Sequence, residues 1–234
     1  MENVLFIVEA LVIAAALVLV AYLIEKLIKK KNQDSERVLS TRKVVVIGVF
    51  GALAAVLMLF EIPMPFAPSF YKLDLSELPI LINAFAYGPV AGVMTELIKI
   101  LLKLIMKPSS TAFVGELANF LVGVSFVLPA SLIYLWKKNK KSALLACVAG
   151  TLIMTVFGTL LNAVYLLPTF AALYGMPLEA IIGMGTQINS KITDVTSFVI
   201  FAVAPLNLIK GFVVSLVTLL IYKPLSPILK GQRK

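Results

Sequence analysis

The feature that most constrains this chain is a series of long apolar runs separated by clusters of lysine and arginine. Hydrophobic residues make up 60% of the 234 residues, and the mean hydropathy is +1.01. Such values lie far outside the composition of water-soluble domains. About 20 consecutive apolar residues are enough to cross the hydrocarbon core of a bilayer as a helix. The sequence therefore predicts an all-α integral membrane protein that crosses the cell membrane several times.

The basic residues indicate how the chain is oriented. The net charge is +9, and most lysines and arginines gather in residues 26–43, in residues 137–141 and at the C-terminus. Because basic loops stay on the cytoplasmic side, these three clusters are expected in the cytoplasm. The first apolar run, Val4–Ile24, ends at the first cluster, which predicts an N-terminus outside and a cytoplasmic C-terminus. This loop charge is explained by the lipid bilayer and requires no nucleic-acid partner.

The chain divides into three expected parts. Residues 1–31 hold an additional N-terminal transmembrane helix, residues 32–43 a cytoplasmic linker, and residues 44–234 a six-helix membrane domain. The charged linker suggests that the first helix is detachable from the bundle. The six helices are expected over residues 44–60, 74–88, 90–106, 115–136, 142–166 and 195–222. Residues 61–73 and 167–193 are predicted outer loops, the second with a short amphipathic helix over 177–188.

A lysine in the middle of the last apolar run is the most unusual residue. An ammonium at mid-bilayer costs on the order of 2.5–3.5 kcal/mol on insertion scales, so it is expected to face a cavity or a partner. Asn207 precedes Lys210 by three residues and shares its helix face. One interpretation is that Lys210 pairs with a buried carboxylate. The other is that Lys210, Asn207, Asn162 and Asn119 hold a polar small molecule, with apolar contact to a flat ring from Phe66, Phe70 and Tyr71.

Two further patterns concern helix packing. Glu96, Lys99 and Lys103 are spaced to lie on one helix face, which should point into the bundle, and Glu96 and Lys99 can neutralise each other. Two pairs of small residues, Gly48 with Ala52 and Gly51 with Ala55, allow close approach of another helix. That helix belongs either to this chain or to a partner protein.

Some classes of activity are excluded by residue types that are missing. The chain has no histidine and a single cysteine, Cys147. It therefore lacks the residues for histidine-based zinc sites and for Ser-His-Asp or Cys-His catalysis, and it contains no Walker sequence. No catalytic residue and no metal site is expected. An intramembrane enzyme that uses Glu96 or Asp194, and a membrane scaffold without a ligand, remain alternatives.

Five short segments carry a family resemblance. They are Leu-Asp-Leu-Ser-Glu-Leu-Pro (73–79), Tyr-Gly-Pro-Val-Ala-Gly (87–92), Gly-Glu-Leu-Ala-Asn-Phe (115–120), Asn-Ala-Val-Tyr (162–165) and Asn-Leu-Ile-Lys-Gly (207–211). In this order they resemble the substrate-binding subunits of energy-coupling-factor (ECF) vitamin transporters. Within that family the chain is most similar to the riboflavin-specific subunits, over about residues 42–230.

The resemblance implies a six-helix bundle that binds riboflavin from outside. Uptake is then driven by a transmembrane coupling subunit and two ATP-binding subunits, with the flavin as transported ligand and no cofactor. By resemblance, Asn207 and Lys210 match polar side chains that hold the flavin, and Asn162 matches a partner of the ribityl chain. Thr111, Lys72 and Asp74 are candidates for the edge of the ring. Flavin mononucleotide or another vitamin is the alternative ligand.

The resemblance also implies a docking face. In the family, an Ala-x-x-x-Ala pattern on the first core helix faces the coupling subunit. The nearest matches here are Gly48/Ala52 and Gly51/Ala55, which differ from that pattern by a glycine at the first position.

Overall fold

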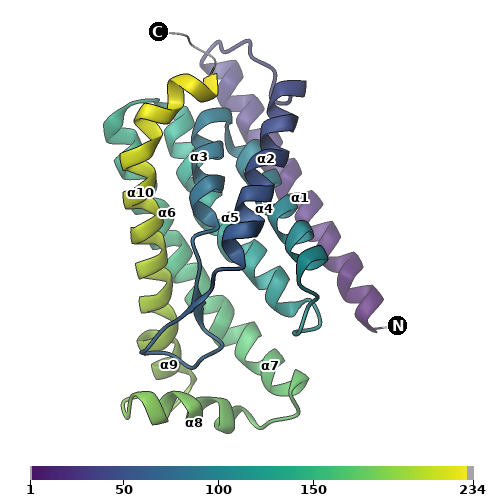
Figure 1. Ribbon diagram of the computed structural model, residues 1–234, viewed down its shortest axis with the longest axis vertical. Coiled ribbons are helices and arrows are strands. Elements are labelled where there is room, and N and C mark those ends of the chain that lie inside the picture. Colours follow the sequence, from purple (N-terminus) through teal and green to yellow (C-terminus); the bar gives the residue numbers. More distant parts are fainter. Residues whose placement is uncertain (1, 231–234) are drawn as a thin grey trace.

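The computed structural model describes residues 2–230 of the chain, and the side chains of residues 6–224. The predicted basic tail at Arg233 and Lys234 lies outside the described residues. Long helices run side by side along the molecule (Figure 1), so the predicted all-α architecture is confirmed. The long elements are α1 (Glu2–Lys31), α2 (Thr41–Met58), α4 (Pro89–Met106), α5 (Val114–Trp136), α6 (Lys140–Leu161) and α10 (Ala204–Lys230).

Five helical segments are long and apolar enough to cross a membrane. They are Phe6–Lys31, Thr41–Met58, Val114–Trp136, Lys140–Leu173 and Val195–Pro224. Helix α4 has 18 residues but carries Glu96, Lys99 and Lys103, and all three side chains are buried. The prediction that this charged row faces the interior of the bundle is therefore confirmed.

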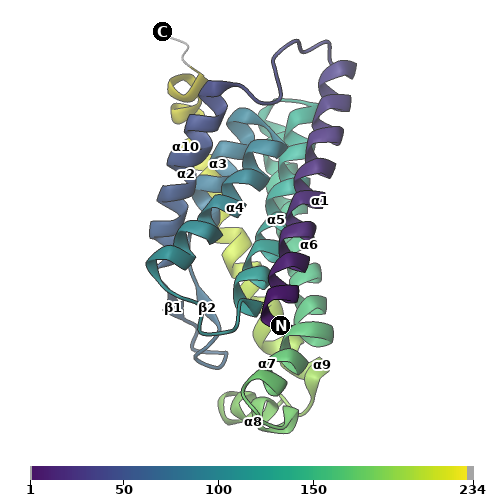
Figure 2. The same ribbon diagram turned by 90° about the vertical axis from the view of Figure 1, so that its right-hand side faces the viewer.

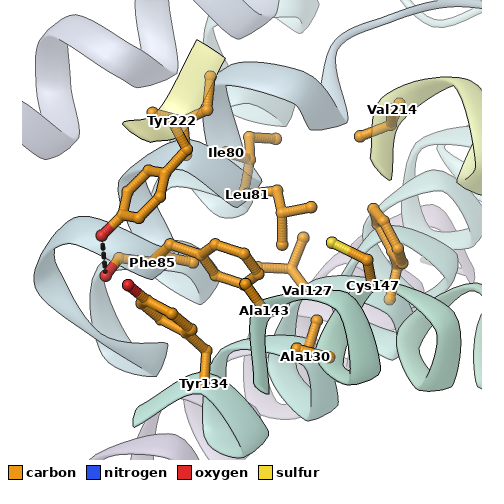
Figure 3. Packing of buried hydrophobic residues seen from close by; sticks show 14 of the residues in the cluster. Ile80, Leu81, Phe85, Val127, Ala130, Tyr134, Ala143, Cys147, Val214 and Tyr222 are labelled. Atoms are coloured by element: carbon orange, nitrogen blue, oxygen red, sulfur yellow. Dashed lines mark hydrogen bonds between the residues drawn. The ribbon is translucent and has the colours of Figure 1, made fainter. Parts of the chain in front are cut away.

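Helix α3 (Glu77–Tyr87) lies at the centre of the bundle. It has only 11 residues, and nine of them are buried. Helices α2, α4, α5 and α10 all contact it. Near its end, the Phe85 ring stacks on Tyr134 of α5 with centroids 4.5 Å apart, and the Tyr222 hydroxyl of α10 donates to the Phe85 carbonyl at 2.9 Å (Figure 3). These contacts fix α3 between α5 and α10.

The end of the molecule opposite the 32–40 linker is closed by short helices. Helix α6 continues through a π-helical turn, η1 (Asn162–Leu166), into α7 (Leu167–Leu173), and α8 (Leu178–Ile188) lies across this end (Figure 1). Helix α9 (Val195–Phe198) leads through η2 (Val199–Val203) into α10. The short helix predicted over 177–188 is confirmed. The prediction that a loop begins at Leu167 was wrong, because Pro168 falls in the first turn of α7, where proline is tolerated.

The segment between α2 and α3 contains a small hairpin that the sequence did not suggest. Strands β1 (Ile62–Pro63) and β2 (Lys72–Leu73) pair antiparallel, with Ile62 opposite Leu73. From there the chain turns into the bundle, and Asp74 is buried just before α3 begins. This segment therefore brings polar residues from the end of the molecule to its interior.

Helix α1 packs against the bundle in the structure, although the charged linker suggested that it could detach. It packs along α4 and α5 (Figure 2), and Ala14 and Ala21 are buried in one apolar cluster with Val90 of α4. The fully buried Glu25 carboxylate accepts a hydrogen bond from the Val90 N–H at 2.9 Å, in the first turn of α4. A carboxylate at this position also suits the positive end of the helix dipole.

The linker is held in place by ion pairs, which is the physical reason why the charged stretch does not separate α1 from the bundle. The Glu36 carboxylate lies 3.6 Å from the Lys29 ammonium of α1 and 3.5 Å from the Lys43 ammonium of α2. Lys43 is itself buried and donates to the Arg37 carbonyl at 2.9 Å. Residues 32–40 therefore connect the ends of α1 and α2 through specific contacts.

We predict that Glu25→Ala lowers the free energy of unfolding by about 1–3 kcal/mol, because the buried Val90 N–H loses its acceptor. Chemical unfolding in detergent micelles would measure the change. Glu9→Ala is the matched control, since Glu9 is an exposed carboxylate on the same helix. Equal stability of the two variants would contradict the anchoring role of Glu25.

Candidate functional site

A cavity of about 650 Å³ lies between the helical bundle and the short helices α7 and α8. This volume is in the range of small-molecule sites. All seven residues predicted to bind substrate line it, although they come from separate segments. They are Lys72, Asp74, Thr111, Asn119, Asn162, Asn207 and Lys210. The structure therefore brings the whole predicted set together, and its contact with a ligand stays a prediction.

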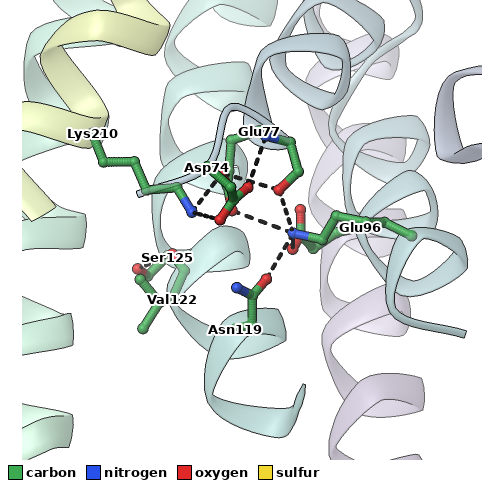
Figure 4. Close-up of polar contacts among 9 residues, drawn as sticks. Asp74, Glu77, Glu96, Asn119, Val122, Ser125 and Lys210 are labelled. Atoms are coloured by element: carbon green, nitrogen blue, oxygen red, sulfur yellow. Dashed lines mark hydrogen bonds and ion pairs between the residues drawn. The ribbon is translucent and has the colours of Figure 1, made fainter. Parts of the chain in front are cut away.

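Lys210 is paired with two carboxylates at the inner end of the cavity (Figure 4). Its ammonium lies 3.0 Å from Asp74 Oδ2 and 2.8 Å from Glu77 Oε2. The interpretation that Lys210 pairs with a buried carboxylate is thus confirmed, and the same side chain also lines the cavity. Glu77 was not among the predicted site residues, although a lysine in mid-membrane requires an acidic partner and so could have pointed to it.

The charge network continues into α4 and α5. The Lys99 ammonium lies 3.3 Å from Glu77 Oε1, donates to Asn119 Oδ1 at 2.8 Å and contacts Glu96. The expected neutralisation of Glu96 by Lys99 is confirmed. The Asp74 carboxylate also accepts a hydrogen bond from the Ser76 N–H at 2.8 Å. Asp74 and Lys210 in the cavity wall therefore belong to an array of paired charges that continues behind the wall.

A second ion pair shapes the loop that carries Thr111. The Lys103 ammonium lies 2.6 Å from Glu116 Oε1, while Ser109 and Thr111 donate to Glu116 Oε2 at 2.7 and 3.2 Å. In the same loop Ala112 and Phe113 have φ angles of 46° and 69°, which are unfavourable for residues other than glycine. The Glu116 hydrogen bonds hold this loop at the cavity, a role that the sequence did not reveal.

Asn162 is bound to the aromatic segment on the other side of the cavity. Its Oδ1 accepts from the Tyr71 hydroxyl at 2.7 Å, and its Nδ2 donates to the Gly158 carbonyl at 2.8 Å. Burial raises the pKa of the Tyr71 phenol, which keeps it protonated as a donor. Tyr71 and Phe70 line the cavity as expected. Phe66 does not, because it packs against the apolar cluster that includes Leu167 and Phe198.

Asn207 differs from the other six predicted residues. It lies one helical turn before Lys210 on α10 and is buried against Gly158 of α6. Its amide makes no hydrogen bond with the described part of the chain, whereas each of the other six has a partner there. Because buried polar groups are normally hydrogen-bonded, this amide is suited to a bond with a bound molecule.

The two pairs of small residues on α2 have different surroundings. Gly51 and Ala55 are buried, and a Cβ on Gly51 would lie 2.5 Å from Ile98 of α4. Their prediction as partner-docking residues is corrected, because this close approach serves packing within the chain. A Cβ on Gly48 would meet no described residue outside its own helix turn within 4 Å, and Ala52 is exposed. Only this second pair is open to a partner.

The carboxylates considered for an enzyme have structural roles instead. Glu96 is fully buried beside Lys99. Asp194 is exposed and caps α9, where its Oδ1 accepts from the Ser197 N–H at 2.7 Å. Neither residue faces the cavity.

Comparisons with a family model and with individual proteins point to the same family. The family model described as "ECF transporter, substrate-specific component" matches residues 42–222. The riboflavin transporter FmnP of Bacillus subtilis is 32% identical over 196 residues, which cover 83% of this chain and 97% of that protein. The riboflavin transporter RibU of Staphylococcus aureus is 35% identical over 189 residues, covering 81% and 93%.

A solved structure is also similar. It is described as the S component of a bacterial ECF transporter and superimposes with a TM-score of 0.62 at 35% identity, covering 80% of this chain and 97% of the other. Helix α1 and the linker precede the region matched by the family model. The match spans the bundle and the cavity, and the family consists of transport subunits rather than enzymes. This multi-pass membrane protein belongs to the substrate-specific components of ECF transporters.

Proposed function

We propose that this chain captures riboflavin from outside the cell in the 650 Å³ cavity. A transmembrane coupling subunit and two ATP-binding subunits then drive its uptake, as in other ECF transporters. The observation that carries this proposal is the convergence of seven predicted polar residues on one cavity. The similarity to two proteins named riboflavin transporters supports the choice of vitamin.

The chemistry of the cavity suits an uncharged ligand with a flat ring and several hydroxyl groups. Its buried lysines, Lys103 and Lys210, are paired with buried carboxylates of the protein, so they need no anionic ligand. Asn207 offers an amide that has no partner among the described residues. The rings of Phe70, Tyr71, Phe170 and Tyr174 supply apolar walls. Riboflavin has these properties, because it combines a flat ring system with an uncharged hydroxylated chain.

The first prediction from this proposal compares two residues on one face of α10. Asn207→Leu should weaken riboflavin binding about fivefold to tenfold, the value of one neutral hydrogen bond, and leave stability nearly unchanged. Lys210→Met should instead lower stability by about 3–5 kcal/mol, because it leaves Asp74 and Glu77 without their common cation. Titration of riboflavin fluorescence quenching and unfolding in detergent would measure both effects.

The double variant Asp74→Asn/Lys210→Met is the control for the loss of stability expected in Lys210→Met. It removes one stranded charge and should restore part of the lost stability. Unchanged riboflavin affinity in Asn207→Leu would show that Asn207 is not part of the binding site. If the wild-type protein shows no saturable binding of any flavin, the proposed function is contradicted.

We also propose the orientation predicted from charge. The basic residues 26–43 and 137–141 gather at the end of the molecule that carries the linker, and α8 lies at the opposite end (Figure 2). By the positive-inside rule the linker end is cytoplasmic, the N-terminus is outside, and the cavity lies toward the outer side.

Cysteine labelling in intact cells tests this orientation. In a Cys147→Ala background, a membrane-impermeant maleimide should label Glu179→Cys on α8, because that position is exposed at the outer end. Lys140→Cys, equally exposed at the other end, should react only after the membrane is permeabilised. The opposite pattern would invert the proposed topology.

The exposed face of α2 is the proposed contact with the coupling subunit. Gly48 and Ala52 form a shallow strip flanked by Val45 and Val49, which are each 61% exposed. Small residues in such a strip allow the backbone of another helix to come close. Gly51 and Ala55 are on the inner side and have no part in this contact.

We predict opposite results for two substitutions three residues apart. Gly48→Leu should leave riboflavin binding and stability intact but abolish uptake, because the new side chain occupies only the outer surface. Gly51→Leu should lower stability by about 1–3 kcal/mol, because the side chain overlaps Ile98. Uptake assays in cells, with binding measured on purified protein, separate these outcomes. Normal uptake by Gly48→Leu would place the contact elsewhere.

A further inference from the structure

The outer rim of the cavity carries two lysines that share a single carboxylate oxygen. The Lys72 ammonium lies 2.7 Å from Glu61 Oε2, and the Lys107 ammonium lies 3.5 Å from the same atom. All three residues line the cavity. The side chains of Lys72 and Lys107 are 39% and 54% exposed, and that of Glu61 is 25% exposed. The side chain of Lys210, at the inner end, is only 10% exposed. The rim is thus the solvent-exposed end of the cavity, and its two lysines and one glutamate give it a net charge of +1.

The fold assembles this rim from two separate segments. Glu61 directly precedes β1, and Lys72 lies in β2, so the hairpin places the two side chains together. Lys107 follows the last residue of α4. One carboxylate therefore joins the hairpin to the end of α4 across the cavity opening.

The other lysines of the cavity are already engaged. Lys103 is paired with Glu116, and Lys210 is paired with Asp74 and Glu77, all of them buried. A phosphate monoester carries a charge of roughly −1.5 to −2 at pH 7. Such a charge is very costly to bury without free cations. A ligand with a phosphate group would therefore place it at the rim, where Lys72 and Lys107 are the nearest cations.

We propose that Glu61 determines specificity, and that it makes the site prefer the uncharged vitamin to its phosphate monoester. The proposal rests on riboflavin being the ligand. Glu61 acts in two ways: its own charge repels a phosphate, and it occupies the two lysines that would otherwise form charge-assisted hydrogen bonds with that phosphate. The hydroxylated chain of riboflavin is uncharged, so its binding is little affected by Glu61.

The test compares riboflavin with flavin mononucleotide, by fluorescence titration of the purified full-length protein. The wild-type protein should bind riboflavin more tightly. Glu61→Gln should change riboflavin affinity less than about twofold and raise flavin mononucleotide affinity about threefold to tenfold, as expected for a partly exposed charge. The gain should disappear at high ionic strength, because the groups at the rim are accessible to salt.

Two further variants keep the test decisive. Glu179→Gln makes the same change of charge on α8 at an exposed position that does not line the cavity, and should alter neither affinity. Lys107→Gln should weaken only flavin mononucleotide, and it provides an independent result if Glu61→Gln does not fold. An unchanged ratio of the two affinities in Glu61→Gln, or an equal change in Glu179→Gln, would overturn the role of Glu61. If the wild-type protein binds neither flavin, the proposed function itself fails.

Discussion

The ion network around Lys210 and Lys99 is the interaction on which the rest of the structure depends. It places three carboxylates and two ammonium groups in the interior of a membrane bundle. Removal of one member of such a network leaves an uncompensated buried charge, which typically costs several kcal/mol. The network therefore requires that Asp74 and Glu77 reach the depth of Lys210. The chain meets this requirement by turning into the bundle after β2 and starting α3 there. With 11 residues at 1.5 Å each, α3 is roughly 16 Å long, about half of a bilayer core.

Much of this arrangement was predictable because the relevant signals are local. Apolar runs and flanking lysines define the long helices, and a lysine inside an apolar run indicates a partner or a cavity. Lys210 and Asn207 were found in this way, three residues apart on one helix. Asp74, Lys72 and Thr111 entered through the family resemblance. Glu61, Glu77 and Glu116 were missed as members of the site because each acts on residues brought near by the fold. A carboxylate in a loop or at a helix start has no local pattern that identifies such a partner.

The wrong predictions also arise because the sequence does not show which distant residues the fold brings together. A run of small residues predicts close packing, but the sequence does not say whether the neighbour is α4 or another protein, so Gly51 and Ala55 were assigned to the wrong side of α2. The charged linker resembles a flexible connection, but Glu36 pairs with both Lys29 and Lys43, and Glu25 accepts a hydrogen bond from the first turn of α4. Helix α1 lies outside the matched family region. It nevertheless contacts the bundle through buried Ala14 and Ala21 and through the hydrogen bond of Glu25 to α4.

The seven predicted cavity residues differ in which existing hydrogen bonds within the protein a ligand would have to displace. Asn162 already accepts from Tyr71, Asn119 accepts from Lys99, and Lys210 is held by two carboxylates. A ligand that competes for one of these engaged atoms exchanges one hydrogen bond for another, so the net gain is small. Asn207 is buried without a protein partner, and a ligand bond to its amide replaces nothing within the described chain. Residues that line one cavity therefore contribute unequally to binding, and the paired charges mainly hold the shape in which the free amide is presented.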